Sequence, residues 1–188
     1  TSNKDRGNTK QKQASHKSVV VVGSKGRKRY LYRVWLDQCR NAIFVEWLYE
    51  AYMYLREKGV DTKRIYIENN SLQDPFYRQV LLPLIYQQGN SYGFTIPITE
   101  DKRKKPDKFY RVEGTLEPLN RMGNLIFNKA LKEDPHMRRM HDQMLGVSEK
   151  AIVMDGPDCL EGACWLIQNR AVRKNMGYAV GAISNRKY

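Results

Sequence analysis

The amino-acid sequence predicts an α/β fold in which a mixed β-sheet is flanked by α-helices. Short β-branched runs that suit strands alternate along the chain with longer stretches whose apolar residues recur at helical spacing. Helix-length crossovers between strands favour parallel pairing, whereas two adjoining strands near the N-terminus favour an antiparallel hairpin. With 188 residues, 41% of them hydrophobic, the chain can form one domain with a substantial core.

The expected elements follow one another along the chain. Strands are expected at residues 19–23 and 30–37, which form the hairpin, and then at 64–68, 94–98 and 123–128. Helices are expected at residues 41–58, 72–86, 106–120, 134–146 and about 157–174. Residues 1–17 are polar and basic, and residues 175–188 are basic and contain glycine. We interpret them as a flexible N-terminal segment and a C-terminal tail around a domain at residues 18–174.

Composition narrows the classes of function. The 33 Lys and Arg against 20 Asp and Glu give a formal charge of +13, which predicts a polyanionic partner. Nucleic acid is the commonest such partner, and an anionic membrane surface is the alternative. We expect neither membrane insertion nor secretion, because no long apolar run and no apolar signal region occurs. The three cysteines lack C-x-x-C spacing and are expected to be reduced thiols. The turn at residues 23–28 lacks the spacing of a phosphate-binding loop, which argues against an ATPase site.

The most informative stretch covers residues 154–165. An apolar run ends at Asp155, and Gly156-Pro157 then favours the start of a helix. Asp155 and Asp158 therefore lie at a strand-to-helix corner with small residues behind them, where both could approach a metal ion and a phosphate. The plainer interpretation is that Asp155 caps the helix and Asp158 complements the helix dipole. Glu161, one turn further on, is expected to have a structural role.

Two other features of the sequence support a site that binds metal and DNA. Glu68 lies at the carboxyl end of the strand at residues 64–68, where open α/β sheets bind ligands, although an exposed strand end would look the same. The basic run that follows predicts contacts with DNA phosphates, unless it is simply a solvated face. Its members are Lys102, Arg103, Lys104, Lys105 and Lys108. The acids Glu68, Asp155 and Asp158 indicate two-metal phosphodiester hydrolysis, because Mg²⁺ and Mn²⁺ prefer charged oxygen ligands.

Three segments resemble the nuclease domain of the large terminase subunits, the DNA-packaging motors of tailed phages. The run K-R-I-Y-I-E-N-N at residues 63–70 resembles that family's second acidic strand, and residues 109–128 resemble its helix-then-strand segment. Residues 154–163 are similar to its closing D-x-x-D-A-L helix start. The resemblance implies a ribonuclease-H-like fold and an endonuclease that cuts concatemeric double-stranded phage DNA with two Mg²⁺ or Mn²⁺ ions. It makes Glu68 the strand acid, Asp158 the helix acid and Asp155 the accessory ligand.

The resemblance also implies partners and a further acid. The family's first catalytic Asp lies on a strand before the hairpin, and we expect it upstream of Thr1, since Asp5 and Asp37 are poor substitutes. Without that acid the fragment is expected to cut poorly. The implied partners are double-stranded DNA, the N-terminal ATPase domain of the same protein, the portal and the small terminase subunit, in the host-cell cytoplasm. Two alternatives stay open: a non-catalytic nucleic-acid-binding module of the same fold, and another ribonuclease-H-like nuclease such as a resolvase or an integrase-like protein.

Overall fold

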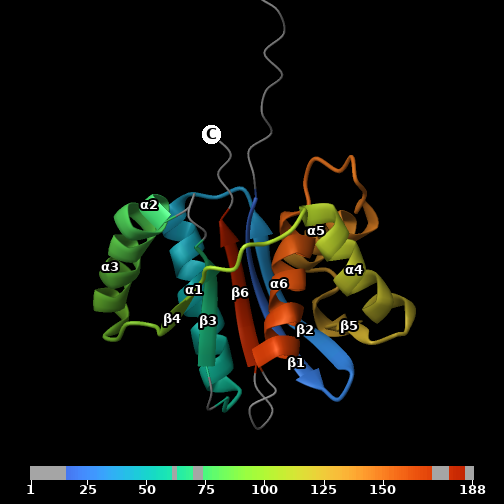
Figure 1. The fold of residues 1–188 in the computed structure, drawn as a ribbon. Coiled ribbons are helices and arrows are strands. Elements are labelled where there is room, and N and C mark those ends of the chain that lie inside the picture. Colours follow the sequence, from blue (N-terminus) through green and yellow to red (C-terminus); the bar gives the residue numbers. More distant parts are fainter. Residues whose placement is uncertain (1–15, 61–62, 70–73, 171–177, 185–188) are drawn as a thin grey trace, which may run out of the picture.

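The structure, a computed structural model, describes residues 16–60, 63–69, 74–170 and 178–184, which form an α/β fold around a mixed sheet. Six strands lie in the order β4–β3–β6–β1–β2–β5 (Figure 1). Their bounds are β1 (Lys17–Lys25), β2 (Lys28–Asp37), β3 (Lys63–Glu68), β4 (Ile98–Asp101), β5 (Leu125–Phe127) and β6 (Tyr178–Ser184). Strand β6 joins a mixed part, formed by β1, β2 and β5, to the parallel pair of β3 and β4.

Strand direction decides which residues meet at each edge of the sheet. In the part of the chain that the structure describes, β1 alone runs against the other strands. It pairs antiparallel with β2 and β6, while the pairs β3–β4, β3–β6 and β2–β5 are parallel. The predicted hairpin of β1 and β2 is therefore confirmed. The carboxyl ends of β2, β3, β4 and β6 consequently lie at one edge, beside the start of β1.

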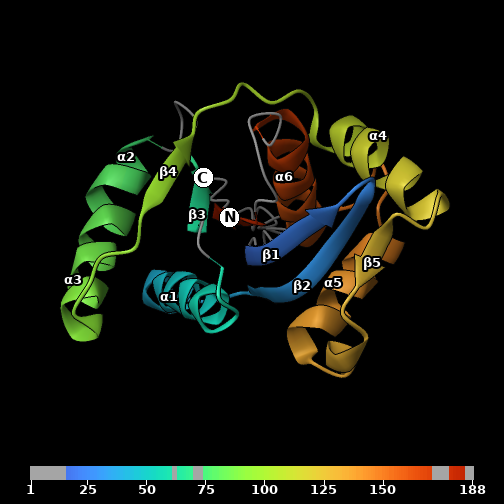
Figure 2. The same ribbon diagram turned by 90° about the horizontal axis from the view of Figure 1, so that it is seen from below.

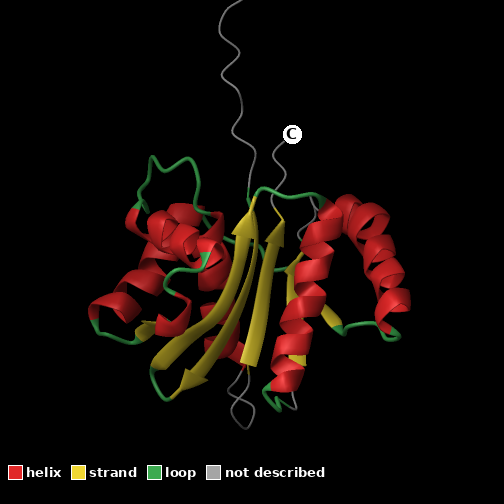
Figure 3. Ribbon diagram, turned by 180° about the vertical axis from the view of Figure 1, so that it is seen from behind, coloured by secondary structure: helices red, strands yellow, loops and turns green. Residues whose placement is uncertain are grey.

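Helices cover both faces of the sheet. Helices α1 (Asn41–Glu57) and α3 (Leu82–Tyr92) lie on one face, and Figure 3 shows α1 in front of the strands with α3 beside it. Helices α4 (Lys108–Arg121), α5 (Pro135–Leu145) and α6 (Asp155–Arg170) lie on the other, and Figure 2 shows β1 between α1 and α6. The short helix α2 (Asp74–Phe76) and a π-helical turn (Tyr77–Leu81) lead into α3, and a 3₁₀ turn (Lys129–Leu131) follows β5. No helix within these ranges combines the length and the apolar character needed to cross a membrane.

Four consecutive valines in β1 show how the two layers are filled. Val19 and Val21 belong to the core beneath α1 and α3, whereas Val20 and Val22 belong to the core beneath α5 and α6. All four are fully buried, as expected for a strand that is covered on both faces. Each such side chain contributes roughly 1.5 kcal/mol or more to the free energy of burial, so both helical layers are held firmly on the sheet.

Three elements differ from their sequence prediction. Strand β4 occupies Ile98–Asp101 instead of residues 94–98. The reason is that Pro97 has no backbone N–H to donate, and Phe94 packs against aromatic rings of the α1–α3 layer. The helix expected to end at residue 86 continues to Tyr92, where Gly93 adopts a φ of 74°. Residues 178–184, to which the sequence interpretation gave no structure, form β6 in the interior of the sheet.

Other boundaries lie within a few residues of the prediction or fall outside the described residues. Helix α6 begins at Asp155 itself, so this residue lies in the first turn rather than before it. The expected flexibility of residues 1–15 and the expected end of α6 near residue 174 lie outside the described residues. The three cysteines are free thiols, as the sequence predicts.

The start of α6 is packed too closely to admit a side chain at its second residue. A Cβ on Gly156 would lie 2.7 Å from Leu36 Cδ2 and 3.0 Å from Met140 Sδ. The Gly156 N–H also donates to Gln143 Oε1 at 2.8 Å, which satisfies one of the free amides of the first turn. The position of the α6 N-terminus is thus fixed by contacts with β2 and α5.

We predict that Gly156→Ala lowers the free energy of unfolding by about 1–3 kcal/mol, because the new methyl group overpacks a closed contact. Gly114→Ala is the matched control, since a Cβ at this α4 position meets nothing within 4 Å. That variant should gain roughly 0.5–1 kcal/mol from helix propensity. Urea denaturation followed by circular dichroism measures both, and equal stability of the two variants would contradict the packing argument.

Candidate functional site

Five carboxylates gather at the edge of the sheet where the parallel strands end, and we call this group the acidic edge. Its members are Glu68, Asp101, Asp155, Asp158 and Glu161. Glu68 is the last residue of β3 and Asp101 is the last residue of β4, and the parallel register places these two residues side by side. The other three acids lie on the first two turns of α6 at intervals of three residues. This spacing puts them on one face of the helix.

The α6 acids are almost completely removed from solvent. Their relative exposures are 5% for Asp155, 2% for Asp158 and 3% for Glu161. A buried carboxylate must be paired or neutralised, because the loss of hydration costs several kcal/mol per charge. The geometry of the acidic edge therefore depends on the cations that reach it.

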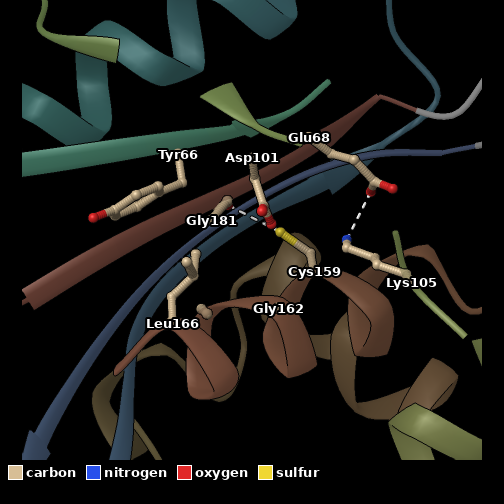
Figure 4. Close-up of a pocket in the computed structure, with 9 residues that line it drawn as sticks. Tyr66, Glu68, Asp101, Lys105, Cys159, Gly162, Leu166 and Gly181 are labelled. Carbon is tan, nitrogen blue, oxygen red and sulfur yellow. Dashed lines mark hydrogen bonds and ion pairs between the residues drawn. The ribbon is translucent and has the colours of Figure 1, made fainter. Parts of the chain in front are cut away.

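Four basic side chains from residues 103–111 pair with the acidic edge. Lys105 Nζ lies 2.9 Å from Glu68 Oε2, and a dashed line marks this ion pair in Figure 4. Lys108 Nζ lies 2.9 Å from Asp155 Oδ1 and 3.4 Å from Asp158 Oδ2, so one ammonium group bridges two carboxylates. Arg111, one turn further along α4, pairs with both Asp158 and Glu161.

Arg103 pairs with Asp101 and also contacts α6. Its Nε and Nη2 atoms donate to the Asp101 carboxylate at 2.8 and 2.6 Å, which is a bidentate pair. Its guanidinium carbon lies 3.7 Å from the centre of the Trp165 ring. We call this arrangement the Asp101–Arg103–Trp165 clamp. It fixes the segment after β4 on the surface of α6.

The protonation of the charged groups at the acidic edge follows from their burial and from their ion pairs. Burial opposes ionisation of Asp101, but the Arg103 guanidinium outweighs it and lowers the pKa of that carboxyl group. Burial raises the pKa of Glu161, although Arg111 favours its charged form. Burial alone would lower the pKa of Arg111, but Asp158 and Glu161 raise it, so this guanidinium remains charged. Charge pairing thus controls the protonation of Asp101 and Arg111, while burial dominates at Glu161.

A small pocket opens between the sheet and α6 beside these groups. Its lining includes Glu68, Asp101, Lys105, Cys159 and Gly181 (Figure 4). Cys159 is fully buried and its thiol donates to the Gly181 carbonyl at 2.9 Å. Burial raises the pKa of Cys159 to about 12, so this thiol is neither a nucleophile nor a soft metal ligand at neutral pH.

The structure brings the sequence-predicted acids to one edge of the sheet, but it does not place all three together. Asp155 and Asp158 converge on the Lys108 ammonium, whereas Glu68 faces Lys105. Among the described residues, no group of three His, Cys, Asp or Glu side chains is arranged to hold a metal ion. Asp37 ends β2 at the same edge but pairs with Arg139, and Asp5 lies outside the described residues.

The predicted DNA-binding residues divide into two groups. Lys102 and Lys104 are exposed, and Lys102 pairs with Glu100 at 2.8 Å. Arg103, Lys105 and Lys108 instead turn toward the acidic edge. The run is therefore only partly a solvated face.

Sequence reasoning missed two members of this site. The sequence predicts a strand at residues 94–98, which leaves Asp101 beyond its end, whereas the structure places Asp101 at the end of β4. Arg111 stands three residues after Lys108, and this helical spacing is a signal that could have identified it.

A comparison with models of known protein families found no match, and neither did a comparison with characterised proteins.

The clamp gives a pH-dependent prediction. Asp101→Asn should lower the free energy of unfolding by roughly 3 kcal/mol near neutral pH, because Arg103 loses its charged partner. Since the folded-state pKa of Asp101 is lowered, its stabilising effect is present above the unfolded pKa of about 3.9 and is lost as pH falls further. The difference between variant and wild type should accordingly shrink below about pH 4.

Urea unfolding at neutral and acid pH measures this effect. Glu117→Gln is the control, because Glu117 and Arg121 form an exposed pair on α4 with its two charged atoms 2.9 Å apart. Its loss should cost about 0.5 kcal/mol or less. A similarly small loss of unfolding free energy for Asp101→Asn at neutral pH would show that the clamp contributes little to stability.

Proposed function

We propose that this chain is a metal-dependent endonuclease domain that cleaves double-stranded DNA, with a ribonuclease-H-like fold and a place in phage genome packaging. The carrying observation is the convergence of Asp155 and Asp158 on a single cation at the edge where Glu68 ends β3. Carboxylate oxygens that already hold one ammonium ion at about 3 Å offer the hard donors that Mg²⁺ and Mn²⁺ prefer.

The arrangement of the sheet supports the same proposal. Parallel strands with helices on both faces place ligand sites at the strand carboxyl ends, and Glu68 lies at such an end. In the terminase nucleases the first catalytic acid lies on a strand before the hairpin, and an additional strand of this kind could reach β1 only at the side that faces away from β2. In this structure β6 pairs with that side of β1. An additional strand that carried such an acid could therefore pair with β1 only if β6 were displaced.

The residues have distinct roles in this proposal. Glu68 and Asp158 would be the main metal ligands, and Asp155 would be the accessory one. Two bound ions would activate the attacking water and stabilise the leaving oxygen of the phosphodiester. The exposed Lys102 and Lys104 would bind the DNA backbone without reading its sequence. The ATPase domain, the portal and the small terminase subunit remain the proposed partners, and the host-cell cytoplasm remains the proposed location.

The test is cleavage of supercoiled plasmid in the presence of Mg²⁺ or Mn²⁺. Asp158→Asn and Glu68→Gln should each reduce the rate by about 100-fold or more, because each removes a charged ligand. Glu117→Gln, an exposed change on α4 with the same loss of charge, should leave the rate unchanged. Equal cleavage by wild type and Asp158→Asn would show that the site assignment is wrong.

A second candidate function is a non-catalytic nucleic-acid-binding module. It is favoured by the observation that Lys and Arg side chains pair with every carboxylate of the acidic edge. This module would bind DNA in a salt-sensitive way that is indifferent to metal. Calorimetric titration with Mn²⁺ separates the candidates, since only the nuclease should bind the ion and lose that binding in Glu68→Gln.

A further inference from the structure

The segment that follows β4 carries the cations that occupy the acidic edge. Arg103 belongs to the clamp, Lys105 lies in the linker, and Lys108 and Arg111 lie in the first turn of α4. With four of these cations against five carboxylates, the acidic edge as described carries one net negative charge. The protein therefore nearly neutralises its own site without a metal ion.

Lys105 interacts through its ammonium group with acids from several elements of the acidic edge. Its side chain is only 11% exposed, and it pairs with Glu68 from β3. Its charge also favours the ionised form of groups on two other elements, which are Asp101 at the end of β4 and Glu161 on α6, although burial still raises the pKa of Glu161. One ammonium group thus acts on carboxylates from three elements, as a bound cation would.

Lys108 has the same relation to the α6 pair. Its ammonium group lies where oxygens of Asp155 and Asp158 meet, and a divalent ion that used both oxygens would need that place. Two cations cannot share it, because like charges at such a distance repel by several kcal/mol at an effective dielectric constant of about 20. The Lys108 side chain is 30% exposed, so it has a path to solvent.

The clamp allows the lysines to leave without unfolding the segment. Arg103 stays between Asp101 and Trp165 through contacts that involve neither Lys105 nor Lys108. The Asp107 carboxylate accepts from the amides of Phe109 and Tyr110, which fixes the start of α4 independently. Rotation of two long, flexible side chains is then sufficient to expose the carboxylates.

We propose that Lys105 and Lys108 compete with the divalent metal ions for the carboxylates of the acidic edge. When DNA binds, the two ammonium groups move from these carboxylates to DNA phosphates, so that metal and DNA bind cooperatively. This inference rests on the proposed metal-dependent function and adds its regulation. Two divalent ions added to the acidic edge as described would leave a net charge of +3, whereas withdrawal of both lysines would reduce it to +1. DNA phosphates give the displaced ammonium groups new partners. By linkage, DNA then raises metal affinity and metal raises DNA affinity by the same factor.

The first experiment measures Mn²⁺ binding without DNA by isothermal titration calorimetry. Lys105→Met and Lys108→Met should each bind Mn²⁺ about tenfold more tightly than wild type, because the competing cation is gone. Lys132→Met is the control, since it removes the same charge from an exposed lysine that follows the 3₁₀ turn and pairs with Glu133. It should change the affinity little. Circular dichroism confirms that each variant is folded.

The outcomes separate this inference from the function on which it rests. If no form of the protein binds Mn²⁺, the metal-dependent function fails and the competition fails with it. If wild type binds Mn²⁺ and all three variants bind it equally, the metal site stands and the competition is overturned. Weaker binding of Mn²⁺ by Lys105→Met or Lys108→Met would also overturn it, because the lysines would then help to hold the carboxylates in place for the metal ion.

A measurement on the unaltered protein covers the case in which a variant does not fold. The ¹⁵N resonances of the Lys105 and Lys108 ammonium groups should shift on titration with Mg²⁺, and that of Lys102 should not. Unmoved Lys105 and Lys108 signals at saturating Mg²⁺ would overturn the proposal.

The coupling between metal binding and DNA binding is measured by fluorescence anisotropy of a DNA duplex with and without Ca²⁺. The factor by which Ca²⁺ tightens DNA binding should be about tenfold smaller in Lys108→Met than in wild type, and an equal factor would overturn it.

Discussion

The pairing of buried carboxylates with cations from the segment after β4 is the constraint on which the acidic edge depends. Three acids in the first two turns of α6 have lost nearly all contact with solvent, which would be prohibitive for isolated charges. Lys108 and Arg111 make this burial tolerable, and they do so from the start of α4. The packing of α4 on α6 is therefore as much an electrostatic requirement as a hydrophobic one.

The same pairing explains why the site supports two functional interpretations. Oxygens that converge on an ammonium ion can also converge on a metal ion, so the arrangement suits a nuclease that is held in check without its cofactor. Equally, acids that are permanently neutralised would leave only a basic, DNA-binding surface. What distinguishes the two is whether Lys105 and Lys108 can exchange partners, because this exchange decides the charge that a metal ion would meet.

Much of the fold could be predicted from the sequence, because local patterns dominate its first half. The strand at the valines of β1, the hairpin and the helix at α1 are all confirmed, and α1 buries Phe44, Leu48 and Leu55 in the core. The candidate site was predicted less completely. Glu68, Asp155 and Asp158 lie at one edge of the sheet, but the shift of β4 past Pro97 concealed Asp101. The inward turn of Lys105 could not be read from a basic run, since its partner Glu68 stands 37 residues away.

The sequence by itself determined the α/β class, a helix start within two residues of Asp155 and the excess of basic charge, because each depends on neighbouring residues or on composition. Only the tertiary structure decided that β6 pairs with both β1 and β3. It also decided that one lysine bridges Asp155 and Asp158. The physical reason is that strand order and ion pairing are settled by contacts between distant segments, in which burial of charge selects the partners.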